Sequence, residues 1–304
     1  MSDYYHHRFY ALGTRIEFII IHDSYQDARQ ICEDAERIVS KIEREFNCND
    51  PESIIAEINK NAASKPVHLN DETWYIMNEC MHYHDLTNEI FDVTVYPQTR
   101  PQKRMQSDVE RDTAFTGLAD GTPAEVIGMK RVTLHEEDHT IFFNKPGMAI
   151  DLGGYGKGYA MRLVNNNLKA AGIDNAFLSF GESSIMGLGR HPHGDCWKVR
   201  INALYSFVPT DHVFELKDQS ISSSASFEGE GNMIHIFDPR EMKFINERKQ
   251  VTVRCHDPVA AEVLSTSLIA AQDDEQKEIM SRFIDCDAVE ISIDENDSPR
   301  VKHI

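Results

Sequence analysis

The stretch Asp151-Leu152-Gly153-Gly154-Tyr155-Gly156-Lys157-Gly158-Tyr159-Ala160 is the most informative part of this chain for its fold. It follows an apolar run at residues 148–150 and precedes apolar residues at helical spacing, which predicts a strand-to-helix connection. Glycines let a backbone approach a ligand closely and direct several N–H groups at an anion. Asp151 and Lys157 add an acceptor and a cation. The stretch therefore predicts an anion-binding loop, with a purely structural glycine turn as the alternative.

Two common glycine-rich signatures do not match this loop. A P-loop needs Ser or Thr directly after its lysine, and Gly158 stands there instead. A dinucleotide fingerprint needs G-x-G-x-x-G at the start of a βαβ unit, whereas this loop has G-G-x-G-x-G in mid-chain. The loop alone therefore does not identify its ligand.

The composition is that of an ordinary globular protein of 304 residues, 41% hydrophobic and 27% charged. The formal net charge of −19 argues against nucleic acid and against anionic membrane surfaces as partners. No apolar run is long enough for a membrane span, and no signal peptide is recognisable at the first residues. The six scattered cysteines are interpreted as thiols in a reducing compartment. We expect a cytoplasmic protein, or an exported one if the sequence is a trimmed form.

Strand and helix patterns are intermixed along the chain, which predicts an α+β or α/β fold. Asp71 and Asp257 are expected to cap helices, the latter with Pro258 in the first helical position. Residues 90–97 are interpreted as an extended edge, and residues 98–125 as a loop. The expected strands are 8–21 (entered through a glycine turn), 132–134, 140–143, 176–180, 197–201, 213–216, 233–237 and 289–293, and the further helices are 23–46, 53–59 and the one after residue 160.

Two groups of polar residues are candidates for a metal site and for a catalytic site. Glu262 and Thr266 are four apart and share one helix face, where a carboxylate and a hydroxyl suit a hard cation such as magnesium. The alternative is an exposed glutamate beside a helix-facing threonine. Serines between 220 and 226, with His235 beside Asp238-Pro239-Arg240, suit a phosphate ester and proton transfer. Loop serines and a structural histidine explain that second pattern equally well.

The order of these pieces resembles the ApbE family, the FAD:protein FMN transferases. The glycine loop is similar to that family's D-L-G-G-I-A-K-G-Y-A. The other matching segments are Leu12-Gly13-Thr14 (M-G-T), Pro51-x-Ser53 with Asn59 (P-D-S-E-L-S-x-x-N), Phe91-Asp92-x-Thr94-Val95-x-Pro97 (F-D-P-T-V-G-P), His235-Ile236-Phe237-Asp238-Pro239-Arg240 (H-I-I-D-P-R) and Ala261-Glu262-Val263-Leu264-Ser265-Thr266 (A-D-A-L-S-T). The matches are collinear over most of the chain.

The resemblance implies an α+β fold of the duplicated T-fold type, with mixed sheets and packed helices. Residues 1–304 would form one domain of two closely packed halves, whose boundary the sequence leaves open. It also implies an enzyme that uses Mg²⁺ to cleave the pyrophosphate of FAD. The enzyme would attach FMN through a phosphoester bond to a threonine of an acceptor flavoprotein and release AMP, a phosphoryl transfer.

The resemblance also implies site residues by position. His235 would take the proton from the acceptor threonine, and the metal would be held by Glu262, Thr266 and the carbonyl groups of Gly154 and Ser265. The residues expected to contact the flavin nucleotide are Leu12, Asn49, Ile90, Phe91, Asp92, Asp151, Lys157, Gly181, Glu182, Ser223, Ser224 and Ile236. Two of these positions depart from the family pattern, because Glu262 stands where the family has aspartate and Asn49 where it has tyrosine.

Two other functions fit the same residues. A magnesium-dependent FAD pyrophosphatase would use water as the acceptor and yield FMN and AMP. A non-catalytic FAD-binding homologue would retain FAD without turnover, and the departures at Glu262 and Asn49 motivate that hypothesis.

Overall fold

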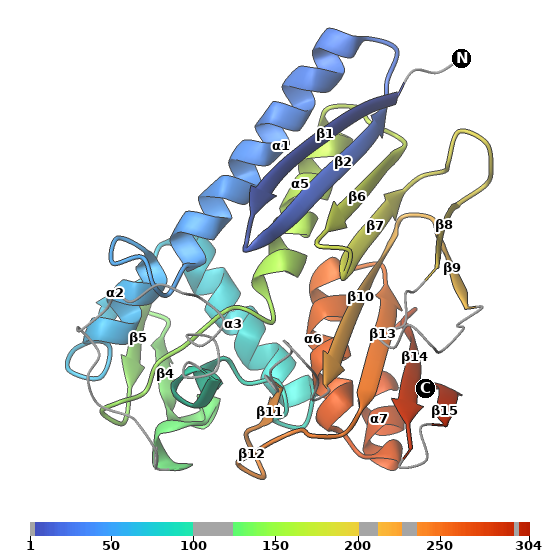
Figure 1. Ribbon diagram of the computed structural model, residues 1–304. Helices are drawn as coiled ribbons and strands as arrows, with labels where there is room; N and C mark the ends of the chain where they lie inside the picture. The colour runs from blue at the N-terminus through green and yellow to red at the C-terminus, as the bar shows by residue number, and fades with distance from the viewer. Residues whose placement is uncertain (1–3, 100–123, 201–211, 227–235, 295–297) are drawn as a thin grey trace.

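A large antiparallel sheet forms the centre of the computed structural model, which describes residues 4–99, 124–200, 212–226, 236–294 and 298–304. Within these residues the sheet has eight strands in the order β1-β2-β6-β7-β10-β13-β14-β15 (Figure 1). Their bounds are β1 Tyr4–Ala11, β2 Thr14–Ile21, β6 Ala176–Phe180, β7 Ser184–Leu188, β10 Gln219–Ser226, β13 Lys249–Cys255, β14 Asp287–Ile293 and β15 Pro299–His303. Each described pairing between neighbours is antiparallel.

The two halves of this sheet share one order of elements. In the first half, β1 and β2 lead into α1 (Tyr25–Phe46), and α5 (Gly156–Ala170) leads into β6 and β7. In the second half, β10 and β13 lead into α6 (Pro258–Ala270) and α7 (Asp273–Met280), which are followed by β14 and β15. Strand-strand-helix and helix-strand-strand therefore occur twice. This duplicated α+β arrangement is the fold class that the family resemblance implies. The sheets were expected to be mixed, whereas every described pairing in the main sheet is antiparallel.

A second layer is inserted between α1 and α5, at the lower left of Figure 1. It contains α2 (Ile54–Asn61), α3 (Asp71–Leu86) and a small sheet in the order β3-β5-β4. The strands are β3 Val67–His68, β4 Val132–His135 and β5 Thr140–Phe143, and the 3₁₀ helices are η1 Val93–Val95, η2 Ala124–Val126 and η3 Met129–Arg131. This layer supplies the supports of the glycine loop.

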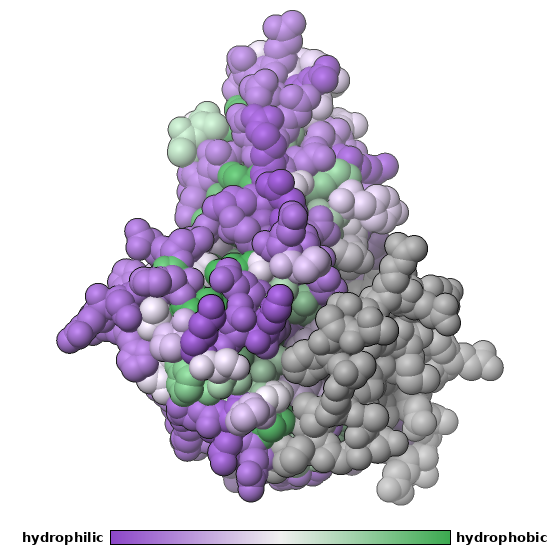
Figure 2. All heavy atoms as spheres, turned by 90° about the vertical axis from the view of Figure 1, so that its left-hand side faces the viewer, coloured by the Kyte–Doolittle hydropathy of each residue, from purple (hydrophilic) through white to green (hydrophobic). Residues whose placement is uncertain are grey.

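The helices differ in how deeply they are buried. One side of α1 packs inward, while residues such as Arg29 and Arg37 are exposed, as the sequence predicts for a surface helix. In the coloured part of Figure 2, the face carrying α1 and α2 is covered mainly by hydrophilic residues. By contrast α6 is buried all round against β10 and β13, and Thr266 is its one residue that is not buried. A polar residue on α6 therefore needs partners inside the protein.

The face of the main sheet that lies away from α6 has a small hydrophobic core of its own. It is covered by the antiparallel pair of β8 (Trp197–Arg200) and β9 (Val213–Leu216). Trp197, Phe214 and Leu216 pack there against Ile185 of β7 and Ile221 of β10. The serine-rich strand β10 is therefore covered on both faces, which fixes its register.

Several local predictions are wrong. The glycine turn expected at the entry of the strand over residues 8–21 is formed by Leu12 (φ 52°) and Gly13 (φ 69°), but it joins two antiparallel strands, β1 and β2, where only one was expected. The extended edge expected over residues 90–97 is instead a turn followed by η1. The side chain of Asp92 accepts a hydrogen bond from the backbone N of Thr94 (2.7 Å), and such local bonds compete with strand pairing.

Three smaller expectations are also corrected. The N-cap of α3 is Asn70 rather than Asp71, because the Asn70 side chain accepts from Thr73 N (2.8 Å). Cys255, at the end of β13, forms a disulfide with Cys286 before β14, so not all six cysteines are thiols. Residues 233–235 of an expected strand lie outside the described residues, and the described part begins with the hairpin of β11 (Phe237–Asp238) and β12 (Lys243–Phe244).

Candidate active site

The glycine loop is held in place by backbone groups on both of its sides. Asn59 of α2 clamps Ile150: its Nδ2 donates to Ile150 O (2.9 Å), and its Oδ1 accepts from Ile150 N (2.7 Å). Asp151 N donates to Val93 O (2.9 Å) at η1, and Gly153 N donates to Asp151 Oδ1 (3.0 Å). The preceding residues 148–150 are not a strand, so these bonds replace the predicted strand as the anchor.

The predicted flavin-contacting turn at Ile90, Phe91 and Asp92 lies beside this loop. A Cβ on Gly154 would be 3.8 Å from Phe91 Cε2, so the ring covers the loop backbone. All three residues are buried. The Asp92 carboxylate accepts from Thr94 Oγ1 (2.5 Å) and Met129 N (3.1 Å) as well as from Thr94 N, and burial raises its pKa. Asp92 therefore fixes the turn from within.

The first turn of α5 meets α6 at Gly158. A Cβ there would come within 2.6 Å of Pro258 O and 2.9 Å of Val259 Cα, so only glycine permits this approach. The close approach brings Lys157 to Glu262, and the Lys157 ammonium donates to Glu262 Oε1. The Glu262 side chain is 5% exposed and that of Lys157 is 23% exposed. The predicted cation of the loop and the predicted metal ligand of α6 thus form one ion pair.

Hydroxyl groups surround this pair. Glu262 Oε2 accepts from Ser184 Oγ of β7 (2.8 Å) and from Ser222 Oγ of β10 (3.0 Å). Ser224 Oγ shares hydrogen bonds with Ser265 Oγ (2.9 Å) and Thr266 Oγ1 (3.1 Å). The structure therefore brings Lys157, Glu262, Ser224, Ser265 and Thr266 together. It adds Ser184, which our sequence analysis missed, and Ser222, which that analysis included only as a member of the serine cluster at 220–226.

The serine-rich segment missed as a strand explains this arrangement. In β10 alternate residues share a face, so Ser222 and Ser224 both point at α6. The intervening Ser223 bonds to Thr252 Oγ1 on β13 (2.8 Å), and its N donates to Ser183 O (2.7 Å). Spacing of two between serines was the available signal, but strand propensity in the segment is low.

Other predicted contact residues lie in turns at one end of the sheet. Figure 1 shows the β1–β2 and β6–β7 turns at the same end. Gly181 N donates to Arg15 O (2.8 Å), and Glu182 pairs with the Arg15 guanidinium (2.8 Å). Leu12 N donates to Glu43 Oε1 of α1 (2.7 Å), and Asn49 Oδ1 accepts from Tyr96 Oη (3.2 Å). Leu12 is therefore tied to α1, and Asn49 is tied to Tyr96, which follows η1.

The His235 segment is described only from its second residue onward, because His235 lies outside the described residues. Ile236 is buried, and its carbonyl accepts from Ile245 N (2.9 Å). The Arg240 guanidinium donates to Asp238 Oδ2 (3.0 Å) and to Glu275 Oε1 (2.6 Å). The Asp-Pro-Arg motif therefore forms an internal ion pair in this structure.

A separate ionic cluster lies on the other side of the α5–α6 crossing. Arg162 of α5 donates to both carboxylate oxygens of Asp257 (2.8 and 2.6 Å), the N-cap of α6. It also donates to both oxygens of Glu79 on α3 (3.0 and 2.9 Å). Tyr83 Oη donates to Asp257 (3.0 Å), and Tyr155 Oη donates to Glu79. The sequence analysis did not single out this cluster.

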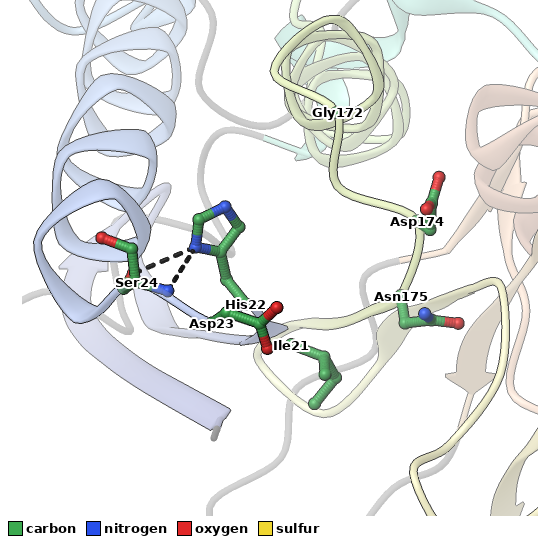
Figure 3. A pocket seen from close by; sticks show the side chains of 7 residues that line it. All are labelled: Ile21, His22, Asp23, Ser24, Gly172, Asp174 and Asn175. Atoms are coloured by element: carbon green, nitrogen blue, oxygen red, sulfur yellow. Dashed lines mark hydrogen bonds between the residues drawn. The ribbon is translucent and has the colours of Figure 1, made fainter. Parts of the chain in front are cut away.

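A surface hollow of about 400 Å³ lies elsewhere, between the start of α1 and the end of α5 (Figure 3). It is lined by Ile21, His22, Asp23, Ser24, Gly172, Asp174 and Asn175, none of which is a predicted site residue. In it, Ser24 N donates to His22 Nδ1 (3.0 Å). Across the described ranges, no three His, Cys, Asp or Glu side chains are grouped as a metal site. Any ion at Glu262 would therefore depend on hydroxyl and carbonyl oxygens.

Comparison with known proteins identifies the relatives of this chain. Two curated relatives are named FAD:protein FMN transferase. That of Vibrio cholerae serotype O1 is 24% identical over 256 residues, 80% of this chain and 74% of the relative. That of Chlamydia muridarum is 23% identical over 232 residues, 71% of this chain and 66% of the relative.

Solved structures share the fold. The flavin transferase ApbE from Vibrio cholerae superimposes with a TM-score of 0.82 at 19% identity, covering 100% of this chain and 97% of that one. The ApbE protein from Thermotoga maritima gives 0.78 at 22% identity, covering 98% and 96%. The model of the ApbE family matches residues 12–289. This chain therefore belongs to the ApbE family.

Proposed function

We propose that this protein is a magnesium-dependent FAD:protein FMN transferase. It attaches FMN through a phosphoester bond to a threonine of an acceptor flavoprotein and releases AMP. The names of the relatives support the FMN transfer. The observation that carries the proposal is the joining of Lys157 of the glycine loop to Glu262, Ser265 and Thr266 of α6 through one hydrogen-bonded network.

The donor atoms at α6 fit a hard cation. The buried Glu262 carboxylate and the hydroxyls of Ser224 and Thr266 are oxygen donors, which Mg²⁺ prefers. We propose that Glu262, Thr266 and the carbonyls of Gly154 and Ser265 hold the ion. When bound, it would neutralise charge on the pyrophosphate.

The chain's own residues have the following proposed tasks. Lys157 contacts a phosphate of FAD, and His235 takes the proton from the acceptor threonine. The threonine oxygen then bonds to the FMN phosphorus while the bond from that phosphorus to the AMP oxygen breaks. The other proposed FAD contacts are Leu12, Asn49, Ile90, Phe91, Asp92, Asp151, Gly181, Glu182, Ser223, Ser224 and Ile236.

The domain organisation of the chain and its location in the cell are also proposals. We propose that residues 1–304 form one domain, since a single core cluster joins residues of both sheet halves and of the inserted layer. No described helix has the length and apolar character needed to cross a bilayer. The cytoplasmic location stays a prediction, and the Cys255–Cys286 disulfide removes one of its premises.

Mass spectrometry of a threonine-bearing acceptor domain tests the activity. After incubation with the full chain, FAD and Mg²⁺, the acceptor should gain the mass of FMN. Thr266→Ala should abolish the gain, whereas Ser267→Ala should not, because Ser267 Oγ donates to its own helix at Val263 O (2.8 Å). FMN and AMP in solution without a gain would indicate the pyrophosphatase instead. Intact, retained FAD would indicate a non-catalytic binder.

A further inference from the structure

The Glu262 carboxylate has two differently occupied oxygens. Oε2 accepts the hydroxyls of Ser184 and Ser222, while Oε1 accepts the Lys157 ammonium. We infer that Ser184 and Ser222 are positioning residues that hold Oε2 and thereby direct Oε1 at the cation. That cation is Lys157 in this structure, and it would be a divalent ion in the loaded enzyme. The inference rests on the proposed function, because it concerns the same metal site.

The two serines form a matched pair on rigid elements. Ser184 of β7 and Ser222 of β10 are direct partners in the antiparallel register, so their side chains stand next to each other on one face of the sheet. Each serine is 2% exposed. Both hydroxyls converge on one carboxylate oxygen, and this bond satisfies each buried donor.

The length of the Glu262 side chain explains why two serines are needed to orient it. Glu262 stands where the resembled motif has aspartate, and a glutamate has one more rotatable bond to fix before it can present an oxygen in one place. Hydrogen bonds from neighbouring groups orient metal-ligating carboxylates and contribute strongly to metal affinity. The two serine hydroxyls supply such bonds to the oxygen that does not face the cation.

Lys157 occupies the other oxygen as a single positive charge. A buried carboxylate needs compensation, and among the described residues Lys157 is the only cation that pairs with Glu262. A divalent ion bound through Oε1 would compete with this ammonium for the same atom. Lys157, displaced from Oε1, would then be free to contact the phosphates of FAD.

Binding of Mn²⁺ to the full chain without flavin tests the serines, measured by electron paramagnetic resonance. Ser184→Ala and Ser222→Ala should each weaken Mn²⁺ binding about 10- to 100-fold. Ser220→Ala is the matched control on the same face of β10, because its hydroxyl donates to Cys255 O (3.0 Å) and not to Glu262. It should leave the affinity unchanged, and Ser222→Thr, which keeps the hydroxyl, should restore most of it.

Lys157→Met tests whether Lys157 competes with the metal ion, because a purely structural lysine would not lower Mn²⁺ affinity. If the ammonium competes for Oε1, this variant should bind Mn²⁺ several-fold more tightly than the wild type while its FAD affinity falls. A variant that binds Mn²⁺ more weakly than the wild type would overturn the competition.

The possible failures are distinguishable. If the wild type binds Mn²⁺ and both serine variants bind it equally well, this inference is wrong while the metal site of the proposed function stands. If the wild type binds no Mn²⁺ either alone or with FAD, the magnesium requirement itself is wrong and the inference falls with it.

Discussion

The two ion pairs at the α5–α6 crossing differ in how completely their charges are satisfied. Arg162 donates to both oxygens of Asp257 and to both oxygens of Glu79, so its guanidinium is enclosed by two carboxylates. Lys157 pairs with one oxygen of Glu262, and the other partners of that carboxylate are neutral hydroxyls. Both pairs join the same two helices on either side of Gly158.

The difference indicates separate tasks for the two pairs. Burial alone would lower the pKa of Arg162, but its hydrogen bonds to Asp257 and Glu79 outweigh burial and raise that pKa. A bidentate guanidinium is suited to a fixed geometry, whereas an ammonium is a point charge that another cation can replace. The Arg162 cluster holds the helices together, and the Lys157 pair is the part that can exchange partners.

Arg162→Met should cause the largest loss of stability. It leaves Glu79 and Asp257 near each other without their cation, and losing the charge-assisted hydrogen bonds of this partly buried cluster costs about 2–3 kcal/mol. Urea unfolding of the full chain measures the change. Arg162→Lys should recover part of the loss, and Arg29→Met on the exposed face of α1 should change little. A loss no greater than that of Lys157→Met would contradict the proposed division of tasks.

Gly158→Ala should disturb both ion pairs at once. The new Cβ would meet Pro258 O at 2.6 Å, so α5 and α6 must separate, at about 2 kcal/mol for overpacking of this kind. Unfolding free energy and FAD affinity should fall together. Gly156→Ala on the same helix is the control, since its Cβ would lie 3.6 Å from Phe46 Cδ2, an ordinary contact. An unchanged FAD affinity in Gly158→Ala would show that FAD binding does not depend on the close approach of α5 and α6.

Local chemistry made some of these features predictable. Asp257 and Pro258 identified the start of α6, because the Asp257 side chain accepts from Val259 N and Ala260 N within the same turn (3.3 Å each). Glu262 and Thr266 were placed on one helix face by their spacing, and the network of α6 includes both of them. Motif order supplied the family and the duplicated fold.

Long-range partners were not predictable from the chain. Nothing near Arg162 in the sequence indicates Glu79 or Asp257, which lie on other helices. Ser184 and Ser222 meet only because β7 and β10 pair in one register. The disulfide of Cys255 with Cys286 likewise depends on β13 lying beside β14, and scattered spacing gives no sign of it.

Lys157→Met should cost less stability than Arg162→Met, about 1–2 kcal/mol, because Ser184 and Ser222 still donate to Glu262. The loss should be recovered by millimolar Mg²⁺, since the ion can take the place of the ammonium at Oε1. Thermal unfolding with and without Mg²⁺ measures this, and Arg162→Met is the matched control that Mg²⁺ should not restore. Equal stabilisation of both variants by Mg²⁺ would show that the two pairs do not differ as argued.

The loss of stability at low pH is the smallest effect that tests the role of the Arg162 cluster. Burial alone would raise the pKa of Asp257, but the hydrogen bonds from Arg162 outweigh it and hold that pKa below its usual value. A lowered carboxyl pKa stabilises the fold above the unfolded value of about 4, and this contribution is lost as the pH falls through the folded value. Asp257→Asn keeps the helix cap but does not titrate. The melting temperature should therefore fall more steeply between pH 7 and 3 for the wild type than for Asp257→Asn. Parallel curves of melting temperature against pH would mean that Arg162 stabilises the crossing through Glu79 alone.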